Sequence, residues 1–296
     1  MYYEQYPVVT SFVVPSYLLV IVMGTFGNLV VLHAYFTGER VWERPYNMIL
    51  SHGVVADLII CAFFTPLLLL YRANAHARLI ESTPLCELSV FSSMLAISLQ
   101  YVIFPLFAVN RRDLVLNSST PILTNTKCKK VLTAGWLMCI VASGILVVLL
   151  RNEIGTEDTP KLHRCILVNS KWDAYTLFFL GYSTLLYCAS TLVAYRCYRD
   201  IRNTDSSDPV LPIDDTRRTT MCMIVAVVYT VFWTPFLLVQ LIGLFGEYSE
   251  LIFNLHAVAS VFGVLASAVN PYLYSYMDHY YRKKFINIFK FAMNED

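Results

Sequence analysis

One acidic side chain lies in the middle of a long apolar run. Of the 21 Asp and Glu residues, only Asp57 has such a position, within Val54-Val55-Ala56-Asp57-Leu58. An ionisable group is costly in this setting and is a candidate functional site by default. Two chemistries fit it. Asp57 is either a cation or proton site, or a protonated carboxyl group that hydrogen-bonds neighbouring helices and holds them together.

Cys86 and Arg111 lie at the two ends of another apolar run. They are 25 residues apart, and a helix over this distance is about 37 Å long, enough to cross a bilayer core. Cys165 lies in a later loop on the same side as Cys86. The oxidising exterior permits a disulfide between these two cysteines. Arg111 and Arg112 either anchor the inner face as ordinary basic residues or have a specific function.

The composition indicates a membrane protein. The chain has 296 residues, of which 57% are hydrophobic and 15% are charged, and its mean hydropathy is +0.55. Soluble domains are about 45–50% apolar and about 25% charged. The net charge of +1 argues against nucleic acid as a partner, because nucleic-acid binding requires a basic excess.

Seven stretches are long and apolar enough to cross the lipid bilayer as helices. They lack the alternation of β-barrel strands and are longer than such strands. We therefore expect an all-α seven-transmembrane helix bundle formed as a single domain by residues 1–296. A short amphipathic helix at about 279–291 is favoured over a frayed tail after the seventh span. The expected spans are residues 12–36, 46–71, 88–110, 131–150, 174–195, 219–244 and 251–276.

The basic residues predict the orientation of the bundle. Sixteen of the 22 Lys and Arg residues fall on one side of the spans and six on the other. By the positive-inside rule, the N-terminus is outside and the C-terminus is cytoplasmic. The one Asn-x-Ser/Thr sequence, Asn117-Ser118-Ser119, then lies inside the cell, and we expect it to carry no N-glycan.

Several short motifs occur in order along these spans. They are Gly27-Asn28, Ala56-Asp57, Cys86 with Cys165, Arg111, Trp136, Phe232-Trp233-Thr234-Pro235 and Asn270-Pro271-Tyr272-Leu273-Tyr274. Together they resemble the motifs of rhodopsin-like (class A) G-protein-coupled receptors over nearly the whole chain. The resemblance implies a multi-pass plasma-membrane receptor of orphan, peptide or lipid type, with no cofactor. It also implies a disulfide between Cys86 and Cys165, and a heterotrimeric G protein as the cytoplasmic partner.

The resemblance further implies an activation switch. Asn110 stands where the family has an acid beside Arg111, so that carboxylate is missing. Asp215 precedes Trp233 by 18 residues, about 27 Å of helix, and is the remaining candidate partner of Arg111. Alternatively, Asp215 is a solvated charge and Asn110 replaces the acid by a hydrogen bond. Pro235 and Pro271 are either hinges or sites of static curvature. The implied switch residues are Asn110, Arg111, Asp215, Trp233, Pro235, Asn270, Pro271 and Tyr274.

The resemblance also indicates a sodium site or polar core formed by Asp57, Gln100 and Asn28, although Gln100 and Ala266 replace residues that the family often has there. Tyr195 is matched to the family's fifth-span tyrosine.

At the outer end, Ser93 replaces the aspartate of amine receptors, and the seventh span has no lysine for a retinal Schiff base. A lipid, a small apolar molecule or a peptide is compatible with the expected pocket, unless its residues simply pack against each other. The expected lining is Val90, Ser93, Met94, Ile97, Leu237, Gln240, Ser260 and Val264.

Two other membrane classes serve as alternatives. A transporter would show internal repeats or paired broken helices. An intramembrane hydrolase would need several zinc ligands in the spans, whereas His33, His52 and His256 are scattered. We expect a receptor that is not an enzyme and has no metal site.

Overall fold

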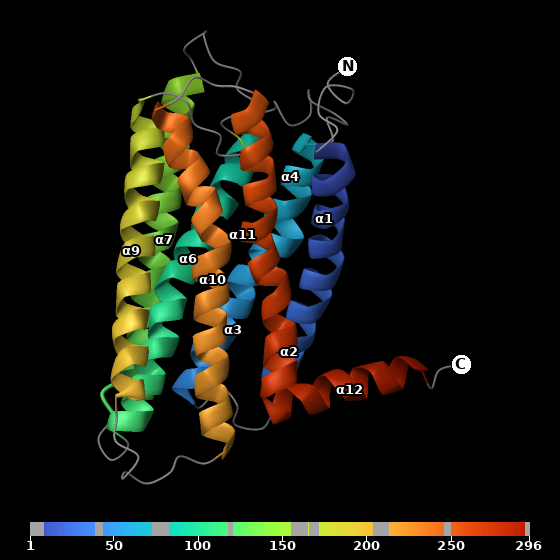
Figure 1. Cartoon of the computed structure of the whole chain (residues 1–296), viewed down its shortest axis with the longest axis vertical. Coiled ribbons are helices and arrows are strands. Elements are labelled where there is room, and N and C mark those ends of the chain that lie inside the picture. Colours follow the sequence, from blue (N-terminus) through green and yellow to red (C-terminus); the bar gives the residue numbers. More distant parts are fainter. Residues whose placement is uncertain are drawn as a thin grey trace.

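The computed structural model describes residues 9–38, 44–72, 83–117, 121–154, 165, 172–203, 213–245 and 250–293. All regular elements in these residues are helices. The long helices run side by side as a bundle, and a shorter helix projects sideways from its lower end (Figure 1).

The first two membrane helices are interrupted by π-helical turns. The first consists of η1 (Val9–Val13), α1 (Val14–Leu19), η2 (Val20–Gly24) and α2 (Thr25–Thr37), and the second of α3 (Pro45–Leu58), η4 (Ile59–Phe64) and α4 (Thr65–Arg72). The remaining elements are α6 (Thr83–Leu116), α7 (Asn125–Ile154), α9 (Ala174–Arg202), α10 (Ile213–Phe245), α11 (Glu250–Met277) and α12 (His279–Met293).

Seven helices of the described residues are long and apolar enough to cross a membrane, which confirms the predicted fold class. Several of them extend past the predicted boundaries. The predicted third span, 88–110, lies within α6 (Thr83–Leu116), and the fourth, 131–150, lies within α7 (Asn125–Ile154). The prediction stopped at charged residues, but a helix satisfies its own backbone and can continue beyond the hydrocarbon core. Arg111 and Arg112 therefore belong to α6 and do not begin a loop.

Helix α6 is the central helix of the bundle. In its most apolar stretch of 18 residues, 78% is buried inside the bundle, against 33% for the corresponding stretch of α7 and 28% for that of α9. It packs against α3, α7 and α9. It also contains Pro105, in addition to Pro235 in α10 and Pro271 in α11. Membrane helices tolerate such prolines because neighbouring groups satisfy the freed backbone.

Helix α12 confirms the predicted short helix after the seventh span. It begins at the foot of α11 and extends sideways beyond the long helices (Figure 1). Tyr281 and Phe285 are buried against the bundle. The Tyr280 hydroxyl donates a hydrogen bond of 2.6 Å to the carbonyl oxygen of Ala34 in α2. Burial raises the pKa of the Tyr281 hydroxyl above its ordinary value, so this side chain is neutral at physiological pH.

Candidate functional site

A buried carboxyl group joins three helices at mid-bundle. Asp57, in α3, is 1% exposed. Its Oδ1 accepts a hydrogen bond from the Gln100 amide of α6, and its Oδ2 accepts one of 2.9 Å from Asn270 Nδ2 of α11. Gln100 Nε2 also donates to Ser267 Oγ over 2.9 Å. Amide nitrogens thus face both carboxyl oxygens, whereas a hard cation prefers oxygen ligands. The oxygens of the same two amides, Gln100 Oε1 and Asn270 Oδ1, are buried and have no hydrogen-bond partner among the described residues.

Asn28 is joined to this core indirectly. Its Nδ2 donates to the carbonyl oxygens of Gly24 over 2.9 Å and of Ser267 over 3.1 Å. The residue before Asn28 is Gly27, and a Cβ at this position would lie 2.7 Å from Pro271 Cγ. The close approach of α11 therefore explains why a glycine precedes Asn28. Ser267, which contacts both Asn28 and Gln100, is absent from the sequence prediction because a serine in an apolar helix carries no distinguishing pattern.

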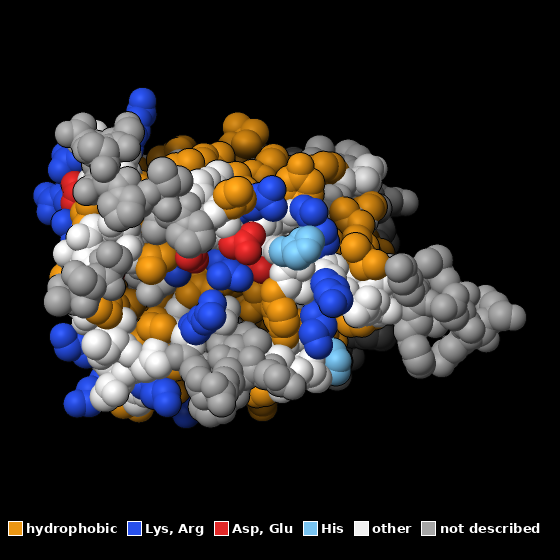
Figure 2. Space-filling model, turned by 90° about the horizontal axis from the view of Figure 1, so that it is seen from below, with side chains coloured by type: hydrophobic (Ala, Val, Ile, Leu, Met, Phe, Trp, Pro, Cys, Tyr) orange, Lys and Arg blue, Asp and Glu red, His pale blue; other side chains and the backbone are white. Residues whose placement is uncertain are grey.

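At the end of the bundle that carries α12, Arg111 is buried between two polar partners. Its side chain is 5% exposed, and its Nη1 lies 3.8 Å from Asp215 Oδ1 of α10. Its Nη2 donates a hydrogen bond of 2.6 Å to Asn110 Oδ1. Viewed from this end, acidic and basic side chains gather near the centre of the face (Figure 2). The structure therefore brings Asn110, Arg111 and Asp215 together.

Trp233 lies apart from this charged group, within the core. It is 1% exposed and packs edge-on against Phe236, with ring centroids 5.4 Å apart. Gly263 of α11 allows close contact, because a Cβ there would lie 3.0 Å from Trp233 Cζ3. Tyr274 is also buried. The proposed switch residues therefore form a charged group at the α12 end of the bundle and a second group within its core.

Three residues of the inner face were not identified from the sequence. Arg218 of α10 donates through Nε to Asp278 Oδ2 over 2.7 Å. The Tyr46 ring lies beside two guanidinium groups, with its centroid 4.7 Å from Arg111 Cζ and 5.6 Å from Arg218 Cζ. Asp278 lies two residues beyond the end of the predicted seventh span (251–276), so it was not counted among the acids within the spans.

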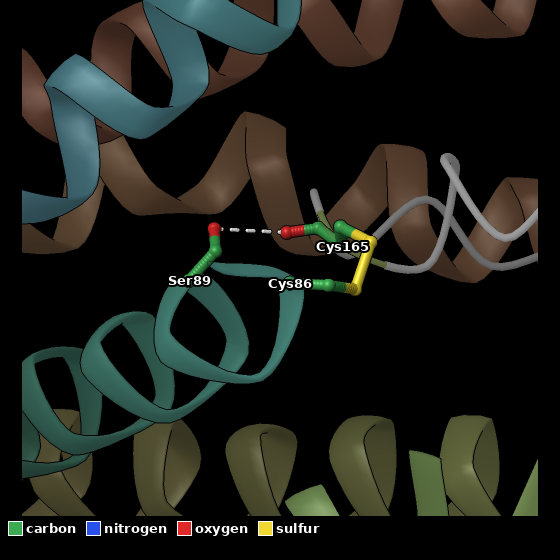
Figure 3. The surroundings of a disulfide bond; sticks show 3 residues. All are labelled: Cys86, Ser89 and Cys165. Atoms are coloured by element: carbon green, nitrogen blue, oxygen red, sulfur yellow. Dashed lines mark hydrogen bonds between the residues drawn. A yellow bond between two sulfur atoms is a disulfide. The ribbon is translucent and has the colours of Figure 1, made fainter. Parts of the chain in front are cut away.

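The end of the bundle opposite α12 carries the predicted disulfide. Cys86 is bonded to Cys165, with their Cα atoms 4.8 Å apart, and both residues are buried. Ser89, one turn along α6, donates a hydrogen bond of 2.9 Å to the Cys165 carbonyl oxygen (Figure 3). Nearby, Arg151 of α7 binds both carboxylate oxygens of Glu87 over 2.6 Å each. The N-terminal end of α6 is therefore attached both to residue 165 and to α7.

The expected pocket residues are all buried. Each of the eight is at most 6% exposed, and Leu237 is the most exposed of them. Ser260 exchanges a 2.6 Å hydrogen bond with Tyr17, and Gln240 exchanges one of 3.1 Å with His256. Ser93 donates to the Val90 carbonyl oxygen over 2.9 Å. Tyr17 and His256 were not predicted as members of this group. Tyr17 is 243 residues from Ser260 and His256 is 16 residues from Gln240, so no local sequence pattern links these partners.

Tyr195, which was matched to the family's fifth-span tyrosine, is 62% exposed. Tyr198, three residues further on, packs against the hydrophobic core. Helix α9 has no proline to mark its register. Charge and hydrophobicity alone therefore left the inward face of its last turns undetermined.

Comparison with known proteins identifies the family. The profile described as "7 transmembrane receptor (rhodopsin family)" matches residues 27–274. The chain belongs to this receptor family. Ser93 in place of the amine-receptor aspartate and the absence of lysine from the seventh span place it outside the amine receptors and the opsins.

The relatives of the chain are distant. It is 25% identical over 299 residues to neuromedin-U receptor 2 of Rattus norvegicus, covering 92% of this chain and 74% of that protein. It is 19% identical over 294 residues to neuropeptide Y receptor type 6 of Mus musculus, covering 90% and 77%. It is 22% identical over 292 residues to melanopsin-A of Danio rerio, covering 88% of this chain and 46% of that protein.

Proposed function

We propose that this protein is a plasma-membrane receptor that binds an extracellular non-amine ligand and catalyses nucleotide exchange on a heterotrimeric G protein. The observation that carries the proposal is the burial of Arg111 between Asn110 and Asp215 at one end of the bundle, in a chain of this receptor family. An arginine held by one amide and one part-exposed carboxylate is restrained weakly. We therefore expect measurable signalling without ligand.

A peptide is the ligand class that we favour. Two of the relatives described above are named as receptors for neuromedin U and neuropeptide Y. The disulfide at the outer end of α6 would form one wall of the ligand entrance. A lipid or a small apolar molecule remains compatible with the mostly apolar residues around Val90 and Leu237.

The proposed orientation places the N-terminus outside and α12 on the cytoplasmic side. The excess of basic residues on the α12 side supports it, with 16 Lys and Arg residues against six. The G protein would then bind the face that carries Arg111 and Arg112.

The alternatives are a transporter and an intramembrane hydrolase, and no observation favours either. Among the described residues there is no group of three or more His, Cys, Asp or Glu side chains that could hold a metal ion. His52 accepts a 3.1 Å hydrogen bond from Trp136 Nε1 across the interface between α3 and α7. This hydrogen bond gives His52 a structural role between the two helices.

Purified receptor in lipid nanodiscs, mixed with a panel of G proteins, tests the proposal before any ligand is known. We expect the wild-type protein to accelerate GTPγS binding by at least one Gα subtype, and Arg111→Gln to alter this rate. Lys130→Gln, an exposed change in α7, serves as the control. Failure of correctly folded receptor to stimulate any subtype, either alone or with peptide libraries, would overturn the proposal.

A further inference from the structure

We propose that Arg218 and Asp278 form a second ionic restraint, one that holds the inner end of α10 against the junction of α11 and α12 and opposes receptor activation. The activation part of this inference rests on the proposed function. The pair joins residues 60 positions apart in the sequence, and neither residue was among the expected switch residues.

The geometry of this pair is closer than that of Arg111 with Asp215. Arg218 Nε lies 2.7 Å from Asp278 Oδ2, and the side chains are 21% and 1% exposed. Arg111 Nη1 lies 3.8 Å from Asp215 Oδ1 and has no hydrogen-bond partner. A short charge-assisted hydrogen bond is stronger than a separated ion pair. Among the described residues, the Arg218 bond is therefore the tightest charged contact between α10 and its neighbours.

Asp278 also determines how the last helix begins. It directly precedes α12, and its Oδ1 accepts a 2.9 Å hydrogen bond from the Tyr280 backbone N–H. This is the arrangement of an N-terminal helix cap. One carboxylate thus caps α12 with one oxygen and binds α10 with the other. Movement of α10 away from α11 would leave this buried carboxylate without its cationic partner, which is costly.

The Tyr46 ring connects the two restraints. Its centroid lies 4.7 Å from the Arg111 guanidinium and 5.6 Å from that of Arg218, distances at which a cation is attracted to an aromatic face. Asp215 lies 3.8 Å from both guanidinium groups. The two arginines, two aspartates and one tyrosine therefore form a single charged cluster that spans α3, α6, α10 and the start of α12.

Substitution of each partner should have a different effect. Arg218→Gln leaves the Asp278 carboxylate buried with only the Tyr280 N–H. Asp278→Asn retains an oxygen that can cap α12 and leaves Arg218 with Asp215 as a neighbouring charge. We therefore expect Arg218→Gln to raise basal nucleotide exchange by about three- to tenfold and Asp278→Asn by about two- to fivefold. The double variant should differ from Arg218→Gln by less than the effect of Asp278→Asn alone.

The matched control is Arg217→Gln. Arg217 is the same residue type at the adjacent position, is exposed, and forms no ion pair among the described contacts. Each variant is measured in nanodiscs for basal GTPγS exchange per mole of receptor. Hydrogen–deuterium exchange at residues 213–220 and 278–282 provides a readout that does not depend on a G protein. Arg218→Gln and Asp278→Asn should accelerate amide exchange in both segments, whereas Arg217→Gln should not.

The outcomes separate the two proposals. If amide exchange at both segments is the same in Arg218→Gln, Asp278→Asn and Arg217→Gln, the ionic restraint is refuted whatever the receptor does to G proteins. If amide exchange rises but the basal activity of a signalling receptor does not, the pair is structural only and its role in activation is refuted. If neither wild type nor any variant stimulates a G protein, the proposed function fails, and hydrogen exchange alone then decides whether the pair restrains α10.

Discussion

The substitution Asn110→Asp tests whether the missing acid beside Arg111 leaves the resting state under-restrained. In the wild-type protein, Arg111 Nη2 donates over 2.6 Å to the neutral amide oxygen of Asn110. An aspartate at this position would present a charged acceptor in the same place. Hydrogen bonds to charged groups stabilise by about 1 kcal/mol more than neutral ones. Because Arg111 is buried, little of this difference should be lost to solvent screening.

The expected change follows from the conversion of free energy into populations. A gain of about 1 kcal/mol for the resting state corresponds to about a fivefold lower active fraction, so Asn110→Asp should lower basal nucleotide exchange by about this factor. Asp215→Ala should act in the opposite direction. The Asp215 side chain is 29% exposed and 3.8 Å from Arg111, so its removal should cost the resting state about 0–1 kcal/mol, up to about a fivefold rise in basal exchange.

The assay is ligand-free GTPγS exchange, normalised to receptor that is correctly folded and present at the cell surface. Asp214→Ala is the matched control, because Asp214 is the exposed neighbour of Asp215 in the first turn of α10. A ligand-binding or antibody probe of the outer face checks that the variants fold. Basal exchange that is unchanged in both Asn110→Asp and Asp215→Ala would refute this explanation of the resting state, as would a rise in Asn110→Asp.

Further predictions concern other parts of the chain. Cys86→Ser and Cys165→Ser should each reduce surface delivery strongly and lower the stability of the purified receptor by about 2–5 kcal/mol. The control Cys188→Ser, at an unpaired and exposed position, should do neither. Equal surface expression of all three variants would contradict this prediction. Asn117 should carry no N-glycan, so glycosidase treatment should leave the electrophoretic mobility unchanged, and a shift that Asn117→Gln abolishes would overturn the proposed orientation. Replacement of sodium by choline should leave basal nucleotide exchange unchanged, because the amide nitrogens of Gln100 and Asn270 donate hydrogen bonds to the two Asp57 oxygens. Sodium-dependent inhibition that Asp57→Asn abolishes would show that the ion binds there.

The number and approximate positions of the membrane helices could be predicted from the sequence, because about 20 consecutive apolar residues have few other structural solutions. The ends of the helices could not. Arg111 and Asn125 are polar, yet both lie within helices, because a helix does not end where the hydrocarbon ends. The π-helical turns at Val20–Gly24 and Ile59–Phe64 were equally unpredictable, since an extra residue per turn depends on packing and leaves no local pattern.

The residues of the candidate site were likewise only partly predictable from the sequence. Residues that carry distinctive motifs, such as Cys86 and Asn270, were identifiable from the sequence together with their neighbourhoods. Contacts between ordinary residues were not. Arg218 and Asp278 are 60 residues apart and belong to no motif, and only the packing of α10 against the end of α11 brings them to 2.7 Å.

Helix α6 is attached to its surroundings at both ends. At its N-terminal end it carries the disulfide of Cys86 and the bidentate pair of Glu87 with Arg151. Near its C-terminal end Arg112 binds Asp200 of α9 over 2.8 Å. Helix α6 can therefore serve as the stationary helix of the bundle, relative to which other helices are displaced. Experiments that measure motion should accordingly place the reference probe on α6 and the reporter on α10.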